Sequence, residues 1–219
     1  MKCDKNKLIL LATRQVPKLN IVSKKKSFLM KFFYYATLMK LWNPRFLSDY
    51  ITTIGNTIYV PDVTLSWVDL AHEYVHIHQY NTRGAIKYTL QYLFPQVLAI
   101  FSLLAILAIF NLWFLLFLIF LLFLAPWPAP WREDIELRAY ASNVAYATEN
   151  DLDEECRFVN GFIDRIANEF TGLSYYKMSW NRNKVLRILN DYKNFTKSGF
   201  LWAQEPYTTI RKSMNEEAQ

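Results

Sequence analysis

Apolar residues recur at helical spacing in one part of the chain and alternate like a strand in another. Residues 28–42 are rich in aromatic and aliphatic side chains interrupted by lysines, which predicts an amphipathic helix. Ser27 is a suitable N-cap. Asn43-Pro44 ends the helix, because the residue before a proline avoids the helical conformation.

Two short runs rich in β-branched residues follow, Tyr50–Ile54 and Thr57–Val60, with Gly55-Asn56 between them. Two such runs around a two-residue turn predict a β-hairpin, which Pro61-Asp62 closes. Residues 65–80 return to helical spacing and predict a second helix.

The pattern then changes to an uncharged stretch of 29 residues, 97–125, in which Ser102 and Asn111 are the only polar side chains. This is longer than a soluble core helix needs and qualifies as a membrane segment. Prolines and tryptophans lie at its borders, as aromatic residues do at membrane interfaces. Three further helices are expected downstream, over about 131–148, 151–171 and 181–195.

Charge is unevenly distributed along the chain, whose formal net charge is +6. Residues 1–40 contain ten lysines and arginines and one acid, Asp4. A basic N-terminus beside an apolar segment predicts contact with anionic lipid or a cytoplasmic flank. No nucleic-acid-binding module accompanies this charge, so nucleic acid is not expected as a partner. The two cysteines, Cys3 and Cys156, are interpreted as reduced thiols, and no signal peptide is expected in residues 1–26.

The run from His72 to His76 has the form HExxH and uses two of the three histidines in the chain. On a helix, residues four apart lie on the same face, so His72 and His76 can bind one zinc ion. Glu73 is placed to act as the general base toward a water in the open coordination position.

A catalytic zinc site requires a third protein ligand. His78 faces the wrong side of the helix, so a carboxylate from the downstream helix is expected instead, and the candidates are Glu133, Asp134 and Glu136. Glu136 is our choice, because Ala139 one turn later would let the two helices approach closely. Glu133, three residues earlier on the same face, remains the alternative.

HExxH followed by the run from Glu136 to Tyr140 resembles the gluzincin metallopeptidases, whose third zinc ligand is a glutamate. Residues 40–180 further resemble small proteins of tailed bacteriophages that are assigned as metallopeptidases. This likeness rests on four runs: Thr53–Pro61, His72–Gln79, Ala125–Arg132 and Glu136–Tyr140. The resemblance implies His72, His76 and Glu136 as zinc ligands. Many gluzincins have an aspartate where this chain has Tyr140, so the partner of one histidine is unassigned.

The expected fold is α+β and mostly α: a small β-hairpin with an edge strand packs on a zincin-like helical core, with an inserted hydrophobic helical hairpin. The apolar stretch must reverse, because HExxH and Glu136 lie on either side of it and would share one metal ion. Asn111, near its centre, is the natural turn residue, and Pro95 would allow the first arm to continue with a kink into residues 88–94. Each arm, if α-helical, would be about 21 Å long. The predicted divisions are 1–42, 43–94, 95–130 and 131–219.

The expected function is a membrane-associated zinc metallopeptidase that hydrolyses peptide bonds. We expect Thr57, Ile58 and Tyr59 to form an exposed edge strand that pairs with an extended peptide or protein substrate. The lipid bilayer is the second expected partner, with the catalytic part on the cytoplasmic side. The resemblance to phage proteins also allows a place in the virion, with phage or host-envelope proteins as partners. Two alternatives are a non-catalytic membrane or virion component with a structural zinc site, and a zinc amidase acting on cell-wall peptide.

Overall fold

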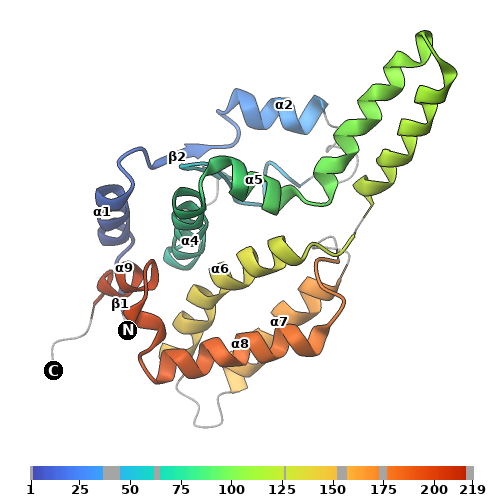
Figure 1. Cartoon of the computed structure of the whole chain (residues 1–219). Helices are drawn as coiled ribbons and strands as arrows, with labels where there is room; N and C mark the ends of the chain where they lie inside the picture. The colour runs from blue at the N-terminus through green and yellow to red at the C-terminus, as the bar shows by residue number, and fades with distance from the viewer. Residues whose placement is uncertain are drawn as a thin grey trace.

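The computed structural model describes residues 2–36, 45–61, 65–125, 127–151, 157–172 and 177–215. It is mostly helical with a small three-stranded sheet, so the predicted fold class is confirmed (Figure 1). Asp62, Pro126, Cys156, and the end of the first predicted helix with Asn43-Pro44 lie outside the described residues.

The N-terminal residues are part of the core. After β1 (Lys2–Cys3), helix α1 (Lys5–Gln15) begins at Asp4, whose side chain accepts from Lys7 N. Leu8 and Ala12 of α1 are fully buried against the helix that carries HExxH. Strand β2 (Asn20–Ser23) and the amphipathic helix α2 (Phe28–Ala36) follow.

The predicted hairpin is present as β3 (Thr52–Ile54) and β4 (Thr57–Val60), joined through Gly55 at φ +59°. The expectation that Thr57, Ile58 and Tyr59 form an edge strand is wrong. Strand β4 is central, because β2 pairs with it in parallel on the side opposite β3, and Ile58 is fully buried. Local alternation cannot show that a strand more than thirty residues earlier occupies that edge. The edge nearest HExxH is therefore β3.

Helix α4 (Trp67–Arg83) carries the HExxH motif and has well-defined ends. Ser66 and Asp69 form a reciprocal capping box at its start, and Gly84 at φ +84° ends it. The short helix α5 (Ala85–Leu93) then places Tyr88 against His76 of α4 and Tyr92 against Glu136.

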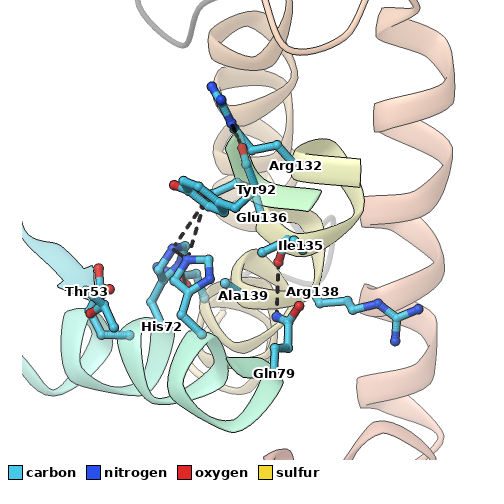
Figure 2. Close-up of polar contacts among 12 residues, drawn as sticks. Thr53, His72, Gln79, Tyr92, Arg132, Ile135, Glu136, Arg138 and Ala139 are labelled. Atoms are coloured by element: carbon cyan, nitrogen blue, oxygen red, sulfur yellow. Dashed lines mark hydrogen bonds and ion pairs between the residues drawn. The ribbon is translucent and has the colours of Figure 1, made fainter. Parts of the chain in front are cut away.

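Helix α6 (Pro130–Glu149) is the central helix of the molecule: α4 packs on one side, and α7 (Arg157–Thr171) and α8 (Arg182–Lys197) on the other (Figure 1). Ala139 is fully buried within the core that includes α4, as expected for a close helix contact. Gln79 of α4 donates to Ile135 O of α6 at 3.1 Å (Figure 2). The chain ends with η4 (Leu201–Ala203), α9 (Tyr207–Lys212) and β5 (Met214–Asn215), which pairs with β1.

The apolar stretch forms two arms, η1 (Gln96–Ile109) and η2 (Leu112–Leu124), that pack together and project from the body (Figure 1). The chain reverses at Asn111, as predicted, and the Asn111 side chain accepts from Trp113 N. Both arms are 3₁₀ helices. In η2 a phenylalanine stands at every third residue from 114 to 123, which suits three residues per turn, and successive rings lie 5.9–6.0 Å apart.

The 3₁₀ geometry changes the expected dimensions of the hairpin. A rise of about 2.0 Å per residue makes the arms about 28 and 26 Å long, against about 30 Å for a hydrocarbon core. Helix α5 does not continue into η1 as a kinked helix; the two meet at 87° around Pro95. Among the described residues no single helix is long and apolar enough to cross a membrane, whereas α5 and η1 together meet that test.

Candidate metal centre

His72 and His76 lie one turn apart on α4 and turn the same ring nitrogen toward one point. Their Nε2 atoms are 3.2 Å apart, and the rings meet edge to face. His76 is buried and His72 half-buried. The i, i+4 spacing thus produces the geometry that the sequence predicts.

Glu136 of α6 reaches the same point from the facing helix (Figure 2). Its Oε2 is 3.6 Å from His72 Nε2 and 3.5 Å from His76 Nε2. A tetrahedral zinc ion with bonds of about 2.0–2.1 Å keeps its ligand atoms about 3.3–3.4 Å apart. The three separations of 3.2, 3.5 and 3.6 Å therefore fit three corners of such a site.

The donor set also has the right electronic character for a cation. His72 Nδ1 is 2.9 Å from Asn143 Oδ1, an acceptor, so the ring proton is on Nδ1 and the Nε2 lone pair faces Glu136. A lone pair and a carboxylate oxygen at this distance repel unless a proton or a metal ion lies between them. The residues present thus fit a zinc ion, which the histidines would bind through Nε2.

Each proposed ligand is held by a second residue that motif analysis does not identify. Asn143 holds His72, and the Tyr88 hydroxyl of α5 is 3.2 Å from His76 Nδ1. Tyr92 donates to Glu136 Oε1 at 2.7 Å, which leaves Oε2 toward the histidines. Such partners fix the orientation of metal ligands. They also supply the histidine partner that the gluzincin comparison leaves unassigned at Tyr140.

Burial and charge act in opposite directions on the buried groups. Burial raises the pKa of Glu136, but the charges and hydrogen bonds of His76 and His72 hold it well below its usual value. Burial lowers the pKa of His72, whereas Glu136, Glu73 and Asn143 raise it, and the net direction is upward. A proton on the histidines would therefore compete with a metal ion for this site.

Glu73 lies beside the three ligands at the wall of a cavity of about 310 Å³. Thr53 of β3 donates to Glu73 Oε2 at 2.6 Å and fixes the direction of the carboxylate. The cavity wall combines His72, Glu73, Tyr140 and Asn143 with apolar residues at the two ends of the hairpin and just beyond it, namely Ile51, Val60, Pro61 and Leu65. One side of the group formed by His72, His76 and Glu136 therefore adjoins an open cavity.

The remaining predicted residues have other positions. Glu133, the alternative third ligand, faces α8, where its Oε1 is 2.8 Å from Lys184 Nζ. His78 is not among the grouped ligands, as expected. The ring of Tyr140 packs edge to face on His72, with ring centroids 4.8 Å apart. Tyr140 therefore supports the imidazole through its ring, where a gluzincin aspartate would offer a carboxylate.

Sequence spacing contained a signal for some of the residues that were missed. Asn143 and Tyr140 follow Glu136 by seven and four residues, so all three share one face of α6. Tyr88 and Tyr92 are likewise four apart on α5. Nothing local indicates that α5 lies across the proposed ligands, because that depends on the turn at Gly84 and on how α5 packs against α4 and α6. Compared with known proteins, the chain matches no family model, no curated protein and no solved structure.

Proposed function

We propose that this protein is a membrane-associated zinc metallopeptidase in which His72, His76 and Glu136 bind the metal and Glu73 is the general base. The observation that carries the proposal is the convergence of three ligand atoms at tetrahedral separations, next to Glu73 and an open cavity. The resemblance of the motifs to gluzincins supports the same function.

A zinc ion at this site would polarise a peptide carbonyl and lower the pKa of a water molecule. The chain's own residues provide the rest of the chemistry. Glu73 accepts a proton at its carboxylate and passes it to the leaving amine. Thr53 holds that carboxylate toward the cavity. Asn143 accepts from His72 Nδ1 and so leaves Nε2 of that ring for the metal, while the Tyr88 hydroxyl orients the His76 ring.

We place an extended substrate along β3 in place of β4. Among the described strands, β4 is the one that pairs with β3, so the other edge of β3 is available for strand addition. Residues 49–51, just before β3, line the cavity, and Thr53 contacts the general base. A peptide on this edge would pass close to Glu73.

Attachment to a lipid bilayer is supported by the surface of the hairpin. Ile109, Phe110, Leu112 and Trp113 at its tip are 74–80% exposed, and apolar surface of this extent calls for an apolar environment. Trp127 and Trp131 stand at its base, where aromatic side chains meet a membrane interface. Helix α2 adds exposed aromatic rings beside lysines, and we assign it to the same, cytoplasmic, membrane surface.

The open cavity favours catalysis over a purely structural zinc site, which would have all four positions filled by protein. Protein purified in detergent and loaded with zinc should hydrolyse casein or a cell-wall peptide, and a chelator should abolish the activity. Glu73→Gln should keep its zinc but lose about 10²–10⁴-fold in rate, because only proton transfer is removed. Wild-type turnover by this variant would refute the peptidase mechanism, and hydrolysis of cell-wall peptide alone would identify an amidase.

A further inference from the structure

The apolar hairpin is attached to the body at two places that both adjoin the metal-binding group. It begins directly after α5, which carries Tyr88 and Tyr92, and it returns into α6, which carries Glu136. Phe94 and Trp131 pack against each other across these two joins, with ring centroids 4.9 Å apart.

One arginine connects the two joins. Arg132, in the first turn of α6, donates from Nε to Tyr92 O at 2.7 Å and from its guanidinium to Gln96 Oε1, also at 2.7 Å. Its guanidinium carbon lies 5.2 Å from the centroid of the Tyr92 ring. Figure 2 shows Arg132 beside Tyr92. Arg132 thus holds the end of α5 and the first residue of η1 with a single planar group.

Tyr92 carries this restraint to the metal ligand. Its backbone carbonyl accepts from Arg132, while its hydroxyl donates to Glu136 Oε1. Arg132 and Glu136 are four residues apart and share one face of α6, so the three residues form a closed ring of contacts. A shift of η1 relative to α6 would first strain the hydrogen bond between Arg132 and Gln96. It would then displace Tyr92, whose carbonyl is bound to the same guanidinium group.

We propose that Arg132 and Tyr92 are positioning residues. They couple the position of the base of the membrane hairpin to the geometry of the third metal ligand, Glu136. The inference rests on the proposed metal site. By thermodynamic linkage the coupling is reciprocal. Metal binding is stronger when Arg132 holds the base of the hairpin in place, and bound metal makes the base of the hairpin more rigid. A lysine cannot replace Arg132, because it has one nitrogen to serve two acceptors that the planar fork reaches together.

The first test measures metal binding by the full-length protein in lipid vesicles. Tyr92→Phe and Arg132→Lys should each weaken zinc binding by about 10–100-fold in competition with a chelator, the usual effect of losing an outer partner of a ligand. Both should change the visible spectrum of bound Co²⁺, which reports ligand geometry. The double variant should lose no more than the weaker-binding single variant, since both act through one contact. Arg138→Lys, on the same helix but paired with Asp134, is the matched control and should bind like wild type.

A second measurement follows the base of the hairpin directly. Hydrogen exchange at residues 92–97 of the wild-type protein should slow when zinc is added, and Arg132→Lys should abolish the slowing. Wild-type affinity and spectrum in both variants, additive losses in the double variant, or unchanged exchange on zinc binding would each overturn the coupling while leaving the proposed enzyme intact. Failure of wild type to bind zinc or Co²⁺ would instead remove the proposed function, and the coupling with it.

Discussion

At the scale of single residues, the buried lysine beside the site is the least expected feature. Lys24 follows β2 and is fully buried; its Nζ donates to Phe46 O at 2.9 Å and lies 3.8 Å from the centroid of the Phe46 ring. Burial lowers the pKa of Lys24 to about 8, although the charge of Glu73 acts in the opposite direction. A lysine-rich sequence gives no indication that one member of the run is enclosed, because the flanking lysines have the same local pattern.

Lys24 predicts a specific dependence of stability on pH. Its pKa is about 8 in the folded protein and 10.5 as the ordinary value, so between these pH values the unfolded chain binds more protons. The free energy of unfolding should therefore gain a contribution from Lys24 as pH rises from 8 to 10.5. Urea unfolding in detergent would measure it. Lys24→Met should lose this contribution, and Lys26→Met, which changes an exposed lysine, should keep it. The same pH dependence in wild type and Lys24→Met would contradict the assignment.

At the scale of elements, the orientation of α6 decides which carboxylate meets the histidines. Sequence spacing put Glu133 and Glu136 on one face of α6. Because α6 packs between α4 and α8, the two residues on that face contact different neighbouring helices. Glu136 turns to α4 and Glu133 turns to Lys184 of α8. The sequence favoured Glu136 but kept Glu133 as the alternative, because both residues satisfy the same helical period.

The two faces of α6 give a prediction for metal content. Glu136→Gln should lower zinc affinity by more than the about 10–100-fold that loss of an outer partner costs, because a charged ligand is removed. Glu133→Gln should keep full zinc occupancy and lose only its ion pair with Lys184. Elemental analysis after dialysis would compare them. Zinc retained by Glu136→Gln and lost by Glu133→Gln would transfer the ligand to Glu133.

At the scale of the whole molecule, the hairpin is what brings together proposed metal ligands that lie 60 or more positions apart in the sequence. A single straight crossing would separate α4 from α6, whereas the reversal at Asn111 brings the chain back, and the two helices pack together. The expectation of a returning chain is confirmed. Its insertion into a bilayer stays a prediction.

Labelling of single cysteines in sealed vesicles would test the arrangement, in a background with both native cysteines replaced by serine. Cysteines at Ala85 and Arg138, exposed positions before and after the hairpin, should react with an impermeant reagent from the same side. A cysteine at Trp113, near the tip, should be protected by lipid in vesicles and should react once the vesicles are dissolved in detergent. Labelling of positions 85 and 138 from opposite faces would refute the hairpin arrangement.

The sequence by itself determined the local features: the pair of histidines on one helix, the hairpin around Gly55, the long apolar stretch and its reversal at Asn111. Each depends on the spacing of nearby residues, which backbone geometry converts directly into shared faces and turns. Tertiary structure decided the rest. It placed β2 beside β4, selected Glu136 over Glu133, and brought Asn143, Tyr88 and Tyr92 to the ligands. These contacts join residues that are distant in sequence, so they follow from how whole elements pack, and no local pattern encodes them.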